Sequence, residues 1–214
     1  MRIFNPDGGE VEACGNASRA VGLLLAHERD GETRIETLGG IIAAKTGDHG
    51  IRVAMGRPRF EWDAVPLAYP MDTLTMPVAW EDLSAPAAVN VGNPHVVFFV
   101  PDCDAIDLAR LGPLIEHDLL FPARINVNVA TITGPDAITL RVWERGAGLT
   151  RACGTGACAT AVAAMRLRLT GRTVTVTLPG GALTIAWDET DTIIMTGPAT
   201  TSFVGSFNED DYPA

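Results

Sequence analysis

The chain has 214 residues, of which 47% are hydrophobic, and its formal net charge at neutral pH is −10. This apolar content can bury a real core, which excludes a disordered chain, and the acidic excess disfavours binding to a nucleic-acid phosphate backbone. The apolar runs are too short to cross a bilayer and no secretion-type segment opens the chain, so the sequence predicts a cytoplasmic protein that binds neither nucleic acid nor membrane.

The first predicted elements are a strand at the N-terminus, Met1-Arg-Ile-Phe-Asn, and a helix that follows Cys14. The apolar residues of this helix recur at helical spacing: Ala17, Ala20, Val21 and Leu24. Asp30-Gly31 ends the helix with a residue pair suited to a C-terminal cap. Several strands are expected to follow.

The same order of elements recurs in the second half of the chain. A strand begins at Leu140, and a second helix follows Cys153 and stops at Gly171. Its apolar residues at helical spacing are Ala157, Ala161, Val162, Met165 and Leu169. Alternating side chains then predict strands at 173–178 and 182–187. Both helices are apolar on nearly every side, which predicts helices enclosed by sheet.

An internal duplication accounts for this recurrence. At an offset of 139 residues, Ala13-Cys14-Gly15 falls on Ala152-Cys153-Gly154 without a gap. The period is too long for a solenoid and predicts two pseudo-symmetric lobes, each a curved, mostly antiparallel sheet around a central helix, which is an α+β fold. We expect residues 1–60 with 200–214 to form the first lobe and 61–199 the second.

The two copies differ before their shared strand. The second copy has a long segment of its own from about Trp62 onward, whereas the first copy begins with the strand at Met1. We therefore expect the first lobe to be incomplete, with its N-terminal strands missing, because a strand without predecessors would leave that lobe short of sheet partners. A single asymmetric insertion is the alternative.

Two of the four cysteines stand where helix chemistry favours a reactive thiol. Cys14-Gly15-Asn16 and Cys153-Gly154-Thr155 each precede a helix, whose first N–H groups lack partners and carry partial positive charge. Such positions can lower a thiol pKa, and the free N–H groups can bind a carboxylate and a developing enolate. A pair of thiols on opposite faces of a carbon could remove and return its proton, which predicts inversion of a stereocentre.

Other interpretations of the cysteines are weaker. A single buried cysteine is usually a core residue, and that interpretation is preferred for Cys103 and Cys158. The recurrence of the other two before Gly and a helix favours catalysis. The cysteine spacing, with no histidine pair nearby, argues against a metal site.

At these residues the sequence resembles the diaminopimelate epimerase family. The matching stretches, in the family's order, are Arg2-Ile-Phe-Asn-Pro-Asp-Gly-Gly-Glu-Val, Ala13-Cys-Gly-Asn, Val91-Gly-Asn-Pro-His95, Arg124-Ile-Asn-Val-Asn and Arg141-Val-Trp-Glu-Arg-Gly-Ala-Gly-Leu-Thr-Arg-Ala-Cys-Gly-Thr-Gly-Ala-Cys-Ala. The resemblance implies interconversion of LL- and meso-2,6-diaminopimelate in lysine and peptidoglycan precursor biosynthesis. It also implies that the enzyme uses no cofactor or metal and forms a homodimer.

The resemblance also implies roles for individual residues. Cys14 and Cys153 would be the acid and base. The remaining substrate-binding positions are Gly15, Asn16, Gly154 and Thr155 at the reacting centre, and Asn5, Asn93, Asn126, Glu144 and Arg145 at the distal end. These side chains suit a doubly zwitterionic ligand, because an arginine can grip a carboxylate while carboxylate and amide oxygens accept from an ammonium.

The sequence departs from the family pattern in two places. The Gly-Asn-Asp-Phe segment that ordinarily opens the family and a later glutamine are not present, and Ala17 and Ala20 replace a glycine and a cysteine after Cys14. These departures leave open a fragment, a gene with a late start, or an inactive homologue that serves as a binding or structural module. A proline racemase-like enzyme of the same fold is a further alternative, but it would carry histidine where this chain has Asn16.

Overall fold

The computed structural model describes residues 1–4, 8–10, 14–26, 32–206 and 208. These residues contain three helices, α1 (Gly15–Ala26), α2 (Leu108–Glu116) and α3 (Gly154–Arg166). The strands are β1 (Glu32–Thr37), β2 (Gly40–Gly47), β3 (Gly50–Gly56), β4 (Ala79–Trp80), β5 (Leu83–Ser84), β6 (Ala87–Asn90), β7 (Pro94–Phe99), β8 (Asn126–Gly134), β9 (Ala137–Glu144), β10 (Gly148–Thr150), β11 (Thr173–Leu178), β12 (Gly181–Trp187) and β13 (Ile193–Gly197). No helix in the described part of the chain is long and apolar enough to cross a membrane.

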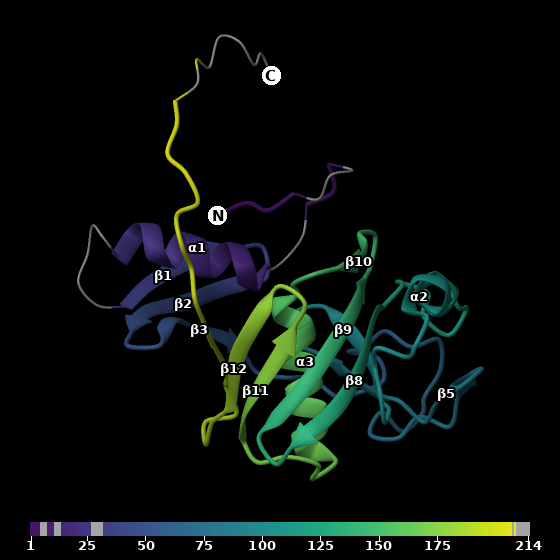
Figure 1. The fold of residues 1–214 in the computed structure, drawn as a ribbon. Coiled ribbons are helices and arrows are strands. Elements are labelled where there is room, and N and C mark those ends of the chain that lie inside the picture. The colour runs from purple at the N-terminus through teal and green to yellow at the C-terminus, as the bar shows by residue number, and fades with distance from the viewer. Residues whose placement is uncertain (5–7, 11–13, 27–31, 207, 209–214) are drawn as a thin grey trace.

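One continuous sheet runs through the molecule (Figure 1). Its strand order is β1-β2-β3-β13-β12-β11-β9-β8-β7-β6, with β10 paired to β9. Neighbouring strands are antiparallel except for β9 with β11 and β7 with β8. The predicted α+β fold with mostly antiparallel strands is confirmed. The two halves are joined where β13 pairs with β3, so they share one sheet.

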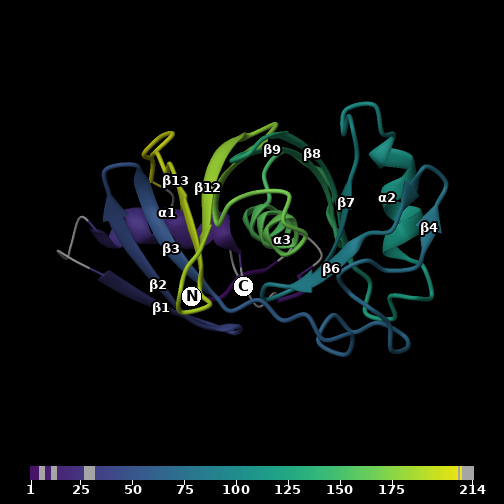
Figure 2. The ribbon, with the colours of Figure 1, turned by 90° about the horizontal axis from the view of Figure 1, so that it is seen from below.

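The second helix is enclosed by this sheet, as its sequence predicts. Figure 2 shows β6–β9, β11 and β12 curving around α3, and every residue from Gly154 to Met165 is buried. Its glycines and alanines let the strands approach closely from several sides. Burial of the larger side chains that these strands contribute, such as Leu140 and Ile185, stabilises the arrangement by roughly 1.5–3 kcal/mol each.

Among the described residues the sheet covers one side of the first helix, which differs from the expectation that sheet encloses both helices. α1 lies against β1, β2 and β3 (Figure 1), and its approach to β2 is close, since a methyl group on Gly22 would come within 2.9 Å of the Ala44 side chain. Ala20 and Leu24 are exposed on the other side. The predicted helix end, Asp30-Gly31, lies outside the described residues.

The predicted N-terminal strand is wrong for residues 1–4. Phe4 forms only an isolated bridge with Glu10, and the amino group of Met1 donates to the Glu36 carbonyl at 2.6 Å. A strand needs neighbours on the sheet for its backbone groups, and this segment has one bridging partner among the described residues. The predicted strands at 173–178 and 182–187 are confirmed as β11 and β12.

A second apolar core supports the outer face of the sheet and fixes the end of β9. α2 packs on β8, β9 and β10, and its Glu116 is 2% exposed. The Glu116 carboxylate accepts hydrogen bonds from the Trp143 indole at 2.7 Å and from the Gly146 backbone N–H at 3.0 Å. These bonds hold the turn between β9 and β10, which carries two of the predicted site residues.

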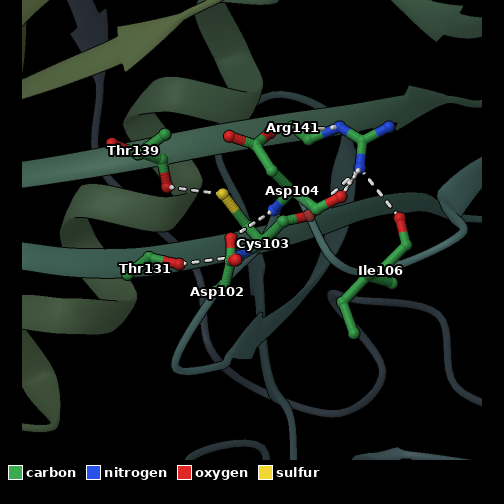
Figure 3. Close-up of polar contacts among 7 residues, drawn as sticks. All are labelled: Asp102, Cys103, Asp104, Ile106, Thr131, Thr139 and Arg141. Carbon is green, nitrogen blue, oxygen red and sulfur yellow. Dashed lines mark hydrogen bonds and ion pairs between the residues drawn. The ribbon is translucent and has the colours of Figure 1, made fainter.

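The loop between β7 and α2 is held by a single arginine of the sheet (Figure 3). Arg141 on β9 donates to the carbonyls of Cys103 at 3.0 Å and Ile106 at 2.8 Å. The Cys103 thiol points toward the Thr139 carbonyl, with sulfur and oxygen 3.8 Å apart, and burial raises the pKa of this thiol. This environment supports a structural role for Cys103.

A substitution in α2 tests how tightly it is packed. A methyl group on Gly112 would come within 2.4 Å of the Trp143 ring, so we expect Gly112→Ala to reduce the free energy of unfolding by about 1–3 kcal/mol. Urea unfolding followed by tryptophan fluorescence measures the change. Gly47→Ala is the control, since its methyl group would meet no atom nearer than 3.8 Å; equal stability of the two variants would contradict the packing.

Candidate active site

A cavity of about 260 Å³ lies where the starts of α1 and α3 meet the end of β9. The residues that line it are Ile3, Phe4, Cys14, Gly15, Asn16, Asn93, Asn126, Glu144, Arg145, Ala147, Ala152, Cys153, Gly154 and Thr155. Ten of the predicted site residues are thus brought together from five separate parts of the chain. The remaining one, Asn5, lies outside the described residues.

The two helix starts are in direct contact. A methyl group on Gly15 would lie 3.4 Å from the Gly154 Cα atom, and one on Gly154 would lie 3.3 Å from the Gly15 Cα atom. Met195 of β13 packs against both, so the methyl group on Gly15 would come within 2.8 Å of its terminal carbon. Only glycine fits at Gly15 without displacing Met195. This contact places the first residues of both helices on one cavity, and the first N–H groups of a helix have no partners within the helix.

Polar side chains of α1 fix the relative position of the two halves. Asn16 donates to the Ala152 carbonyl at 3.2 Å, which lies immediately before Cys153. Arg19 donates to the Asn16 side-chain oxygen at 3.0 Å and to the Met195 sulfur at 3.4 Å. Burial lowers the pKa of Arg19, which remains a cation beside the Cys14 and Cys158 thiols. Asn16 therefore bridges the lobes through the same amide that was predicted to bind substrate.

Cys153 caps α3 with its sulfur. The sulfur accepts a hydrogen bond from the Gly156 N–H at 3.3 Å and lies 3.5 Å from the Thr155 hydroxyl oxygen. Burial raises the pKa of this thiol strongly, and the adjacent Glu144 carboxylate raises it further. The lowered pKa expected at a helix start is wrong for Cys153, because loss of solvation outweighs the favourable helix N–H groups. Cys153 is therefore held as the protonated thiol.

Glu144 and Arg145 reach the cavity from the turn after β9. The Glu144 carboxylate accepts a hydrogen bond from the Thr150 hydroxyl of β10, across the hairpin. Arg145 donates one guanidinium N–H to the Ala123 carbonyl at 3.0 Å, which leaves other N–H groups for a ligand. Opposite charges therefore stand next to each other on one wall of the cavity.

The asparagine wall is built from β7, β8 and the loop before β7. Asn126 is 3% exposed; its amide donates to the Pro94 carbonyl at 2.7 Å and its oxygen accepts from the Arg145 backbone N–H at 2.9 Å. Asn93 contacts the ring of His95, with oxygen and ring nitrogen 2.9 Å apart. Asn126 thus anchors the backbone that presents Arg145, in addition to lining the cavity.

Sequence reasoning missed several residues that line or support the cavity. The missed residues that line it are Ile3, Phe4, Ala147 and Ala152. The last two lie in the long matching stretch around Cys153, from which they could have been identified. The residues that support the cavity without lining it are Thr150, Asn128 and Arg19. Their hydrogen-bond partners could not be identified without the fold. His95, which ends the matching stretch at 91–95, contacts the cavity residue Asn93.

Cys158 lies away from the cavity, in the core. It is fully buried, and burial raises the pKa of its thiol to about 12. This environment supports the structural role expected for it. Among the described residues there is no group of three or more histidine, cysteine or acidic side chains arranged to hold a metal ion.

Comparison with known sequences identifies close relatives. The sequence model of the diaminopimelate epimerase family matches residues 1–61 and 87–202. A diaminopimelate epimerase of Erythrobacter litoralis is 67% identical over 99% of this chain and 77% of its own length. One of Rhizorhabdus wittichii is 64% identical over 95% of this chain and 73% of its own length.

Comparison with solved structures shows the same fold in more distant proteins. A probable proline racemase from Agrobacterium radiobacter superimposes with a TM-score of 0.68 at 17% identity, covering 99% of this chain and 72% of that one. A phenazine biosynthesis protein of the PhzF family from Bacillus anthracis has a TM-score of 0.64 at 16% identity, covering 92% and 76%. At these identities the likeness concerns the fold alone.

The environment of Cys153 yields a prediction about its reactivity. Because the Glu144 carboxylate raises the thiol pKa, Glu144→Gln lowers that pKa and increases the thiolate fraction at pH 8, so alkylation of Cys153 by iodoacetamide is expected to be several-fold faster. Peptide mass spectrometry measures the rate at each cysteine. Glu189→Gln, at an exposed position, is the control, and an unchanged rate in Glu144→Gln would show that the carboxylate does not control this thiol.

Proposed function

The chain belongs to the diaminopimelate epimerase family, and from that premise we propose that Cys14 and Cys153 exchange the α-proton of 2,6-diaminopimelate from opposite faces. The family interconverts the LL and meso forms of this amino acid in lysine biosynthesis, and this chain is an isomerase of that class. The observation that carries the assignment of the two residues is that both cysteines line one cavity at abutting helix starts.

The two thiols are proposed to have opposite protonation states when the substrate binds. Cys153 is held protonated by burial and by Glu144, so it donates the new proton, while the half-exposed Cys14 acts as the thiolate base for that direction. The Cys14 sulfur takes the α-proton and the pair of electrons stays on the α-carbon. The Cys153 S–H then delivers its proton to the opposite face, which leaves Cys153 as thiolate and Cys14 as thiol for the reverse reaction.

The helix starts stabilise the charge that develops between these steps. Removal of the α-proton places negative charge on the carbon and on the attached carboxylate. The unpaired N–H groups beginning at Gly15 and Gly154 point into the cavity and hold this carboxylate, with Thr155 beside them. Because Gly15 and Gly154 carry no side chains, the substrate can approach the backbone closely.

We propose that the polar residues of the cavity outside the two helix starts bind the distal amino acid group. Arg145 offers guanidinium N–H groups to the distal carboxylate, and Asn93 and Asn126 line the same wall. Glu144 lies between the two ends, since it contacts Cys153 as well as lining the cavity. We assign it a second role, to bind a substrate ammonium group, in addition to keeping Cys153 protonated.

We also propose a cytoplasmic homodimer that binds no nucleic acid, following the family resemblance and the net charge of −10. Light scattering with size-exclusion chromatography measures the mass in solution.

Epimerisation by this route exchanges the α-hydrogen with solvent. Incubation of the protein with LL-diaminopimelate in D₂O is expected to place deuterium at the inverted α-carbon and to produce the meso isomer, as measured by mass spectrometry and chiral chromatography. The exchange follows from the use of thiols that equilibrate with water. A folded sample that produced neither deuterium uptake nor meso product would contradict the proposed activity of this chain.

Replacement of individual cysteines separates their roles. Cys14→Ala and Cys153→Ala are each expected to reduce kcat for epimerisation at least about a hundredfold, because each removes a group that transfers a proton. Cys158→Ala, in the helix that Cys153 caps, is the matched control, and it is expected to keep most of the activity. Equal losses in Cys153→Ala and Cys158→Ala, at equal stability, would overturn the assignment.

A further inference from the structure

A buried histidine stands directly behind the asparagine wall. His95 of β7 has no exposed surface, and both of its ring nitrogens contact asparagine side chains. Nε2 lies 2.9 Å from the Asn93 oxygen, and Nδ1 lies 3.0 Å from the Asn128 amide nitrogen. Asn93 lines the cavity, whereas Asn128 of β8 is fully buried. The three side chains form one hydrogen-bonded row that runs from the core to the cavity.

The protonation state of the ring determines which side chain donates each hydrogen bond in this row. Burial, together with the nearby Arg145 cation, lowers the pKa of His95 to about 3, so the ring is neutral at neutral pH. A neutral imidazole has one N–H donor and one acceptor. Since Asn128 donates its amide N–H to Nδ1, the ring proton is on Nε2 and is donated to the Asn93 oxygen.

The reverse order of donors is less favourable. In the observed order one buried atom of the row, the Asn128 oxygen, has no partner. Reversing both amides and the ring tautomer would leave the Asn128 amide hydrogens without the His95 acceptor in the core, and a buried donor without a partner is rarer than an acceptor whose lone pairs are unfilled. The observed order also leaves the Asn93 amide nitrogen free, because no described residue accepts a hydrogen bond from it.

We propose that His95 is a positioning residue that fixes the Asn93 amide so that its NH₂ group, and not its oxygen, faces the substrate. The Asn93 amide and the Arg145 guanidinium then both present hydrogen-bond donors, a pair that suits a carboxylate and disfavours an ammonium group at that point. This inference rests on the proposed function, because the carboxylate it selects is that of the distal amino acid group. His95 does not touch the substrate itself; it acts through Asn93.

The first experiment observes the ring proton without measuring activity. In uniformly ¹⁵N-labelled protein, long-range ¹H–¹⁵N spectra of His95 are expected to show Nε2 protonated and Nδ1 unprotonated, unchanged between pH 5 and pH 8. A spectrum with the proton on Nδ1, or one that shows the imidazolium, would overturn the proposal. This result does not depend on whether the chain is active, so it separates failure of the inference from failure of the proposed function.

The second experiment measures the coupling between His95 and Asn93. His95→Leu removes the donor to Asn93 and is expected to raise KM for LL-diaminopimelate about tenfold with kcat changed less than about twofold, since distal contacts are equal in ground and transition states. His95→Gln keeps an N–H donor and is expected to recover part of that loss. His49→Gln, at an exposed turn position, is the control.

A double-mutant cycle gives the decisive comparison. Because His95 acts through Asn93, His95→Leu in the Asn93→Ala background is expected to add less than about twofold to KM. If His95→Leu and Asn93→Ala instead raised KM additively, the proposal would be overturned. Equal losses of kcat in His95→Leu and His95→Gln would also overturn it. If His95→Leu does not fold, Asn93→Asp serves instead: its side chain has lost the NH₂ donor, so KM must rise, and an unchanged KM would overturn the proposal.

Discussion

The contact between two helix N-termini is the constraint on which the rest of the site depends. Gly15 and Gly154 approach so closely that a side chain on either would meet the other helix or Met195. This approach brings the starts of both helices, and the two cysteines that precede them, to one cavity. The bridge from Asn16 to the Ala152 carbonyl, supported by Arg19, maintains it.

Charge in this cavity is controlled by burial more than by the helix dipoles. The desolvated Cys153 thiol stays protonated beside Glu144, and the desolvated His95 ring stays neutral between two amides. Glu144 acts on the Cys153 thiol and Arg145 acts on the His95 ring, and both lie at the turn after β9 that the buried Glu116 and Asn126 hold through backbone N–H groups. The chemistry of the site therefore depends on the packing around it.

The sequence was sufficient to predict the two repeated helices, two strands of the second copy and ten of the residues that meet in the cavity. The recurrence of Cys-Gly before a helix predicted α1 and α3, and alternation predicted β11 and β12. The arrangement of residues 62–125 could not be predicted, because α2 and its core are defined by contacts with the sheet. The raised pKa of Cys153 was missed for the same reason: it depends on burial and on Glu144, which faces the sulfur only after the β9–β10 hairpin forms. The limits of the two lobes remain a prediction.

Arg19 and Cys158 occupy equivalent places in the two copies of the repeat, at the same offset that relates Cys14 to Cys153. They now lie near each other, a cation from one copy beside a buried thiol from the other. The two copies of the repeat therefore differ at this junction: the first supplies a positive charge that bonds to Asn16, and the second supplies a small thiol that is buried in the core.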